Sequence, residues 1–205
     1  RVQTRAEAAA GGYRLRGSKR YVVAGAVATH YLVTGRLDGE PACFLVAADA
    51  EGLTRETYPT HDGRCGANLE FDLSLAADAL LARGTAAADA LLELRDRALL
   101  ATSAETLGLM QAALDTTVDY TRQREQFGQA LSSFQALQHR MADMLIAVEL
   151  ARSLVQAACT AFDSGSPDAR RLALAAKVKT VAAARRVTQE AIQLHGGIAT
   201  TVEYI

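Results

Sequence analysis

Arginine and glutamine side chains gather around a single glycine near the middle of this chain. Arg124 and Gln126 precede Gly128, and Gln135 and Gln138 follow it. A guanidinium group binds phosphate oxygens in pairs, and a glutamine amide both donates and accepts at the edge of a flat heterocycle. These residue types favour a nucleotide site. The alternative is that they are ordinary polar residues on helix surfaces, and composition alone favours that alternative.

A second group of this kind lies near the end of the chain, where Gln193 precedes Gly196 and Gly197. A glycine pair at a helix end lets a ligand approach the backbone closely, although the same pair also serves as an ordinary helix C-cap. The sequence contains no G-x-G-x-x-G, no Walker loop, no G-x-S-x-G and no H-E-x-x-H. With those phosphate-loop, hydrolase and zinc signatures absent, amide and arginine chemistry at helix junctions remains.

Three stretches of the chain carry apolar residues three, four or seven positions apart, which is the spacing of one helix face. The first is expected from the mid-eighties to about Arg124, the second to end at the stop signal of residues 163–167, and the third at Gly196–Gly197. Alanines in the third helix favour helix and permit close helix approach. The expected stripes are Leu100, Leu107, Met110, Leu114 and Val118; Phe134, Leu137, Met141, Leu145, Val148 and Val155; and Leu174, Val178, Val181, Ile192 and Leu194.

Short alternating or β-branched runs before the helices predict strands over residues 1–72, with a turn at Gly17–Ser18 and a hairpin turn at Asp38–Gly39. Strands followed by helices, without alternation, indicate an α+β fold. We expect a small antiparallel β-barrel or sheet domain over residues 1–80 and an up-down helical bundle over residues 81–205, each of them partial. Three amphipathic helices leave an apolar edge that a fourth normally covers, so we expect a fragment or a chain completed by partners.

The composition is that of a soluble intracellular protein. The chain has 205 residues, 50% of them hydrophobic, and a formal net charge of −1. Because both signs of charge are spread along the chain and no apolar run approaches about 20 residues, neither nucleic acid nor a membrane span is expected. Three scattered cysteines fit reduced thiols, and the four histidines lack ligand spacing, so no metal site is expected either.

A set of linked motifs runs through the helical part in a fixed order. Its members are Tyr120, Arg124–Gly128, Phe134–Gln135, Ala142–Met144, Gln193–Ile198 and Glu203–Tyr204. In order and spacing this set closely resembles the acyl-CoA dehydrogenase family. Residues 11–72 more loosely resemble the middle β-domain of that family. A lone R-x-Q-F-G would be a weak signal, whereas the linked motifs together are a specific one.

The resemblance implies an FAD site that is shared between subunits. Arg124 is similar to the arginine that holds the FAD pyrophosphate across a dimer interface, with Gln126 and Phe127 beside it. Phe134 and Gln135 resemble the pair that contacts the adenosine half of the cofactor. A charged fork for phosphate and amides for the base agree with these roles.

The resemblance further implies that the segment after the third helix receives the adenine end of the neighbouring subunit's FAD. That segment contributes Gln193, Leu194, Gly196 and Gly197.

In the β-domain, Tyr21, Val22 and Val23 stand where the family commonly has a Trp-Ile-Thr that lies against the isoalloxazine. A tyrosine still packs on a flavin, so Tyr21 and Val23 are included among the expected cofactor contacts. Valine, however, cannot donate the threonine's hydrogen bond near the N5 edge, which weakens the case for a normally tuned flavin.

The catalytic base of the family is a glutamate that removes a proton α to the thioester carbonyl, and it occupies one of two places. One place matches Ala98, which has no carboxylate, and the other lies beyond Ile205. No residue of this sequence is therefore nominated as the base. The family's G-x-R-x-S segment is also altered, to Gly63–Gly66, so acyl-CoA contacts are not assigned there.

The function implied by the resemblance is α,β-dehydrogenation of an acyl-CoA by an FAD enzyme, with an electron-transfer flavoprotein or a similar acceptor. The expected assembly is a homo- or hetero-tetramer, a dimer of dimers, in the bacterial cytoplasm or alternatively the mitochondrial matrix. Two alternatives stay open. The chain is a non-catalytic subunit that lends Arg124 and Gln193 to a partner's FAD, or it belongs to an oxidase or flavin monooxygenase of the same fold.

Overall fold

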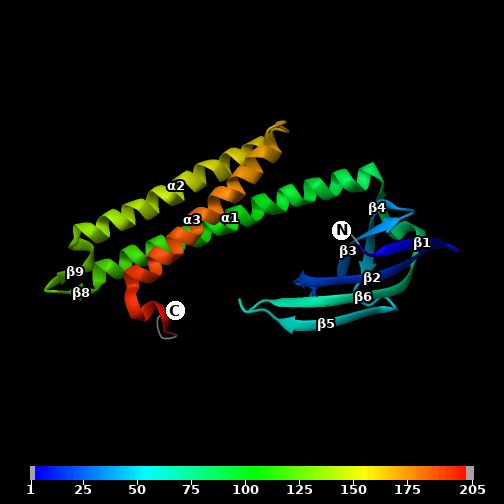
Figure 1. The fold of residues 1–205 in the computed structure, drawn as a ribbon, viewed down its shortest axis with the longest axis horizontal. Helices are drawn as coiled ribbons and strands as arrows, with labels where there is room; N and C mark the ends of the chain where they lie inside the picture. The colour runs from blue at the N-terminus through cyan, green and yellow to red at the C-terminus, as the bar shows by residue number, and fades with distance from the viewer. Residues whose placement is uncertain (1–2, 202–205) are drawn as a thin grey trace. The chain divides into compact units, whose positions relative to one another are not determined.

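The computed structural model of the chain describes residues 3–201 (Figure 1). It contains two compact units, Arg1–Glu93 and Leu94–Ile205. A seven-stranded sheet belongs to the first unit, and three long helices account for most of the second. This arrangement confirms the α+β class expected from strands that precede helices. The proposed domain boundary between residues 80 and 81 stays a prediction.

The sheet of the first unit has the strand order β5-β6-β2-β1-β3-β4-β7. Neighbouring strands pair antiparallel except β1 and β3, which pair parallel, so the sheet is mixed. Its strands are β1 (Arg5–Ala9), β2 (Gly12–Val23), β3 (His30–Leu37), β4 (Glu40–Ala47), β5 (Leu53–Pro59), β6 (Cys65–Ala76) and β7 (Leu80–Arg83), with a 3-10 turn, η1 (Ala77–Ala79), before β7.

The turn predicted at Gly17–Ser18 is wrong, because β2 runs through it and stays paired with β6. Gly17 has a φ of +141°, and a Cβ added there would lie 2.7 Å from the Cα of Thr4. The glycine therefore permits a close approach between neighbouring chain segments, which is a second reason for glycine inside a strand.

A single apolar cluster fills one face of the sheet. Phe44 and Leu15 are fully buried, and the ring of Tyr13 meets Phe44 edge to face at 5.5 Å. Burying these side chains removes several hundred square ångströms of apolar surface from water, which is the main stabilising term for such a unit. The cluster consists of Ala6, Leu15, Tyr31, Val33, Leu37, Ala42, Phe44, Val46, Ala67, Leu69, Phe71 and Leu73.

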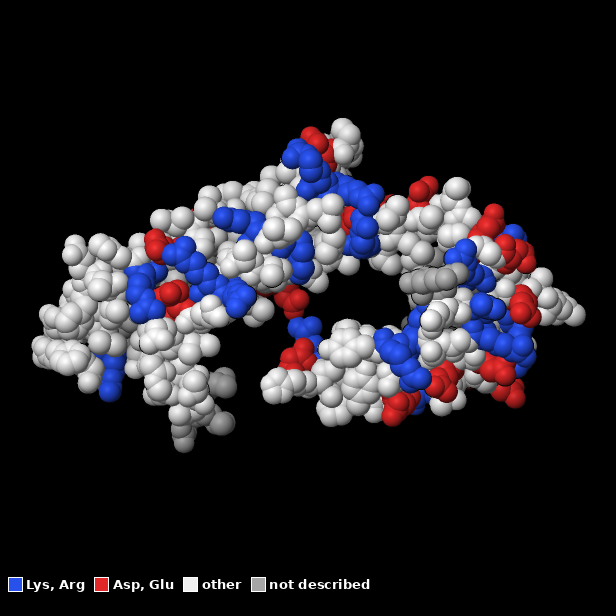
Figure 2. All heavy atoms as spheres, in the orientation of Figure 1, with Lys and Arg blue, Asp and Glu red and all other residues white. Residues whose placement is uncertain are grey.

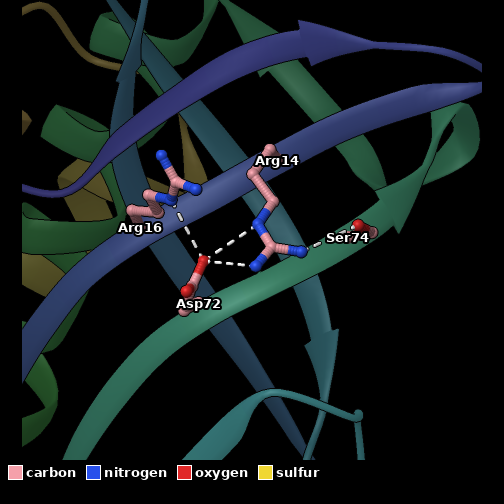
Figure 3. Close-up of polar contacts among 4 residues, drawn as sticks. All are labelled: Arg14, Arg16, Asp72 and Ser74. Atoms are coloured by element: carbon pink, nitrogen blue, oxygen red, sulfur yellow. Dashed lines mark hydrogen bonds and ion pairs between the residues drawn. The ribbon is translucent and has the colours of Figure 1, made fainter.

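The opposite face of β2 and β6 is charged. Figure 3 shows Arg14 and Arg16 of β2 both reaching Asp72 of β6: the Asp72 Oδ1 atom accepts from Arg14 Nε at 2.9 Å and from Arg16 Nε at 3.0 Å. Arg14 Nη1 also donates to Ser74 Oγ at 3.3 Å. These guanidinium hydrogen bonds, that of Arg16 first, lower the pKa of the Asp72 carboxyl. In the view of Figure 2, acidic and basic side chains alternate over this unit.

Asp72→Asn is expected to destabilise the protein at pH 7 and to have no effect in strong acid. The folded pKa lies below the ordinary value of 3.8, so the carboxylate stabilises the fold above that value. The stabilisation is lost as the pH falls through the folded pKa. Urea unfolding of wild type and variant across that range measures the difference. Asp49→Asn, which removes an exposed carboxylate with no ion pair among the described residues, should show no such dependence.

The helices end where the sequence predicts. They are α1 (Thr85–Gln123), α2 (Gln135–Asp163) and α3 (Ala169–His195). Between α1 and α2 lie a two-stranded hairpin, β8 (Glu125–Gln126) and β9 (Gln129–Ala130), and a 3-10 turn, η2 (Leu131–Ser133). A last 3-10 turn, η3 (Gly196–Thr200), follows α3.

The apolar stripe predicted for α3 lies mostly on the exposed face of the helix, so that prediction is wrong. Leu174, Val178, Val181 and Ile192 are exposed, Val178 by 74%, and only Leu194 of that stripe is buried. The buried face of α3 is instead made mostly of alanines, which bring its backbone close to α2. This face consists of Ala173, Ala176, Thr180, Ala183, Val187, Ala191, Leu194 and His195.

The stripes of α1 and α2 are closer to the prediction. Met110 and Leu114 of α1 and Val148 of α2 lie in one buried cluster with α3, as expected. Leu145 of α2 is 48% exposed, however, and Met144 takes the core position instead. By length and composition alone α2 is apolar enough to cross a membrane. That is weak evidence, because α2 supplies the core of this bundle and a second apolar face explains its composition.

Candidate functional site

The first part of the candidate site is the hairpin between α1 and α2. The Arg124 N–H donates to the Tyr120 carbonyl at 2.8 Å, which continues the last turn of α1. Phe127 and Gly128 form the two-residue tip, with φ of +57° and +79°. Two left-handed residues in succession match the type I′ turn of a tight hairpin, and glycine suits the second position.

The side chains of this hairpin are open to solvent. The guanidinium of Arg124 is exposed and has no ion pair among residues 3–201. Phe127 is 92% exposed, and its ring meets that of Phe134 edge to face at 6.2 Å. Gln126 is exposed as well, and its side-chain amide donates to the Glu125 carbonyl at 2.7 Å. A charged donor and an apolar ring are therefore available to a ligand or a partner.

The backbone of Arg124 is bonded to the 3-10 turn that precedes α2, because the Leu131 N–H donates to the Arg124 carbonyl at 2.8 Å. Gln135 is the first residue of the helix and is exposed. The cap residue, Phe134, makes no side-chain capping bond, and the first turn has no acidic residue. A helix N-terminus attracts an anion, and the positively charged Arg124 lies on the hairpin that leads into this one.

The second part of the site is the end of α3. Gln193 is exposed. The Leu194 side chain lies in the helical core and is 5% exposed, so only the backbone of Leu194 is available for contact with a ligand. Gly196 has a φ of +71° and donates to the Ile192 carbonyl, which closes the helix. Gly197 has no positive φ, and a Cβ there would meet nothing within 4 Å. The chain's own packing does not require glycine at residue 197, and its surface is open.

The two remaining predicted contacts belong to the sheet unit. A register shift between Lys19 and Val22 leaves Tyr21 with a φ of +53°, and Tyr21 and Val23 are 65% and 62% exposed. Both line a shallow hollow of about 130 Å³ with the turn of residues 60–66. In that turn a hydrogen bond from the Thr60 hydroxyl is the main cause that lowers the pKa of Asp62.

The structure thus brings part of the predicted set together. Arg124, Gln126, Phe127, Phe134 and Gln135 occupy one place at the hairpin. The segment Gln193–Gly197 is tied to it through an aromatic contact between Tyr120 and His195. Tyr21 and Val23 lie in the other unit. Glu203 and Tyr204 lie outside the described residues.

Sequence reasoning includes His195 in the motif Gln193–Ile198 but assigns it no role of its own. Its ring stacks on Tyr120 with centroids 4.5 Å apart and an angle of 24° between planes. The available signal was position: Tyr120 lies one helical turn before Arg124, and His195 directly precedes Gly196.

No carboxylate takes the place expected for a base at residue 98. Ala98 is an exposed residue of α1. The nearby Asp96 is buried, and its carboxylate pairs with Arg95 at 2.5 Å and with Arg170 at 3.6 Å. A buried carboxylate held by two guanidinium groups is suited to a structural role that ties α1 to the start of α3.

This chain is similar to proteins of one known family. The family model described as acyl-CoA dehydrogenase, C-terminal domain, matches residues 83–205. Probable acyl-CoA dehydrogenase FadE25 of Mycobacterium tuberculosis is 32% identical over 99% of this chain and 54% of the relative. The chain spans about half the length of the curated relatives it matches.

Two solved structures are also similar. The ChsE4–ChsE5 complex from Mycobacterium tuberculosis has a TM-score of 0.86 and 30% identity, over 97% of this chain and 53% of the other. The structure of PigA with FAD and proline has a TM-score of 0.92 and 25% identity, over 98% of this chain and 55% of the other.

Proposed function

This chain belongs to the acyl-CoA dehydrogenase family, and from that premise we propose that it is part of an FAD enzyme that dehydrogenates an acyl-CoA thioester between its α and β carbons. The observation that carries the proposal is the exposed Arg124 guanidinium, which lies on the hairpin whose backbone is bonded to the 3-10 turn leading into α2. The relative FadE25 is named a probable acyl-CoA dehydrogenase, and PigA was solved with FAD. The name of FadE25 supports the proposed reaction, and the PigA structure supports the proposed cofactor.

The described residues fit a dinucleotide. Arg124 would hold the pyrophosphate together with the N–H groups that begin α2, since both present positive charge. Gln135 and Gln193 carry amides suited to a base edge. Gly197 leaves the backbone open to close approach. When bound, the flavin supplies the acceptor for hydride from the β carbon.

The partners follow from the same proposal. The substrate is an acyl-CoA, the electron acceptor is an electron-transfer flavoprotein or a protein like it, and the assembly is a tetramer in which Arg124 and Gln193 serve a neighbouring subunit. FadE25 comes from a bacterium, which favours the bacterial cytoplasm over the mitochondrial matrix.

The visible spectrum of the purified full-length protein tests the proposal. A bound-flavin spectrum is expected, and an acyl-CoA should bleach it without consuming oxygen. Oxygen consumption would instead indicate an oxidase or monooxygenase. Absence of flavin in the full-length protein, alone and with its genomic neighbour, would reject the proposed function.

A second candidate is a non-catalytic subunit of a hetero-oligomer. Ala98 offers no carboxylate, Val23 lacks a hydroxyl, and one similar structure is a complex of two different proteins, ChsE4 and ChsE5. Under this candidate, flavin is present only in the complex, and Arg124 is still required for its retention. Co-purification of the two subunits, followed by the flavin spectrum of each alone, separates the candidates.

Phe127→Gly is expected to leave the fold intact and to weaken flavin retention severalfold. Glycine adopts a φ of +57° without strain, so the free energy of unfolding should change by less than about 1 kcal/mol. Thermal unfolding and flavin content after gel filtration measure the two effects. The matched control is Asp38→Gly, since Asp38 has a φ of +50° in the β3–β4 hairpin. Equal flavin loss in both variants would contradict the role of Phe127.

A further inference from the structure

We propose that Tyr120 and His195 are positioning residues whose stacked rings fix the spacing between the two parts of the FAD site. One part is Arg124 with the start of α2, and the other is Gln193–Gly197. This inference rests on the proposed function. It assigns the pair no contact with the cofactor and no part in the chemistry.

The geometry of the pair is that of a rigid contact. The ring centroids lie 4.5 Å apart with 24° between planes. His195 is 8% exposed, and its Nδ1–H donates to the Ala191 carbonyl at 2.7 Å, because a carbonyl only accepts. That bond holds the imidazole in one orientation. Aromatic pairs at this separation contribute beyond the area they bury.

Each ring is joined to its part of the site by a short, ordered stretch of backbone. The Tyr120 carbonyl accepts the Arg124 N–H at 2.8 Å, so Arg124 follows the position of Tyr120. His195 is the last residue of α3 and directly precedes Gly196. Sliding one ring against the other would therefore change the distance between the guanidinium and the glycine segment. A dinucleotide that spans both parts requires that distance to be constant.

The end of α1 is anchored on its other side as well. Thr121, fully buried, donates to the Val118 carbonyl and reaches the Met141 sulfur of α2 at 3.4 Å. This contact fixes α1 to α2, the ion pair of Arg140 with Glu190 at 2.6 Å ties α2 to the last turns of α3, and the ring pair joins the end of α1 to the end of α3. A tie of a different kind, Lys177 Nζ to Thr102 Oγ1 at 3.1 Å, links α3 to α1 away from the site. It provides a matched control.

The test measures the FAD dissociation constant of the full-length protein. His195→Leu and Tyr120→Leu should each raise it about tenfold, the loss expected for one aromatic pair and its ordering. The double variant should also show about a tenfold increase rather than a hundredfold one, since either change removes the same contact. His195→Phe, which keeps a ring, should stay within about twofold of wild type. Lys177→Ala should not change the constant.

The outcomes separate this inference from the proposed function. Unchanged binding in His195→Leu, or additive losses in the double variant, would overturn the positioning role while wild type still binds FAD. Equal losses in His195→Phe and His195→Leu would overturn it too, because the ring would then not be what matters. Unfolding temperatures of the cofactor-free variants identify a loss that is due to misfolding. Failure of wild type itself to bind FAD would overturn the proposed function.

Discussion

Arg124→Ala in the full-length protein is expected to raise the FAD dissociation constant by about 10- to 100-fold. A hydrogen bond from a charged donor contributes about 1.5–3 kcal/mol, and a phosphate left without its cation loses that contribution. The guanidinium is already exposed and has no ion pair within the described part of the chain. Its removal therefore leaves no buried charge behind, and folding should be unaffected. Fluorescence titration of the cofactor-free protein with FAD measures the change.

Two further substitutions make the result specific. Arg124→Lys keeps the charge and loses the planar fork, so an intermediate loss is expected. Arg122→Ala removes a neighbouring exposed arginine that pairs with Asp119 at 3.8 Å, and binding should stay within about twofold of wild type. If Arg122→Ala weakens FAD binding as much as Arg124→Ala, the effect is one of general charge, and the assignment of Arg124 fails.

Phe44→Ala is expected to destabilise the sheet unit by about 3–5 kcal/mol, the usual cost of truncating a buried phenylalanine. Phe44 is fully buried and meets Tyr13 edge to face. Hydrogen exchange of the β3 and β4 amides measures the loss within this unit, independently of the helices. The matched control is the next residue, since Leu45 lies on the other face of β4 and is 43% exposed. Leu45→Ala should cost about 1 kcal/mol or less, and equal costs would contradict the assignment of the core face.

The helix limits were predictable because the local signals are strong. Gly165 and Pro167 end α2, and Gly196 ends α3, each through backbone conformation alone. The buried face of α3 was not predictable from side-chain size. Leu174, Val178, Val181 and Ile192 are exposed, and the buried face consists mostly of alanines, with Val187 and Leu194 among them. Which face is buried depends on how closely the partner helix approaches, and periodicity contains no measure of that distance.

Strand β1 shows the same limit in the sheet. Its sequence, Arg5–Ala9, has no β-branched or aromatic residue, and intrinsic propensity does not predict a strand there. It forms because β2 and β3 flank it and supply hydrogen-bonding partners on both sides. Tertiary pairing has overridden propensity.

The candidate site likewise has a part that the sequence predicts and a part that it does not. Arg124, Gln126 and Gln135 are close in sequence, and their residue types already indicated phosphate and amide recognition. The contact of Tyr120 with His195 joins the ends of two helices far apart in the chain, and no local pattern predicts it. Physical proximity between distant segments requires the packed bundle.

The tight hairpin between α1 and α2 has a consequence for how this region can change over evolutionary time. Its loop has two residues, and the Leu131–Arg124 bond closes it directly behind. An inserted or deleted residue would open that bond and displace Arg124 from the start of α2. Length variation among related chains should therefore be tolerated in connections such as residues 164–168 and excluded between Arg124 and Gln135. The hairpin would then act as a spacer whose length matters because a change in it breaks the Leu131–Arg124 bond.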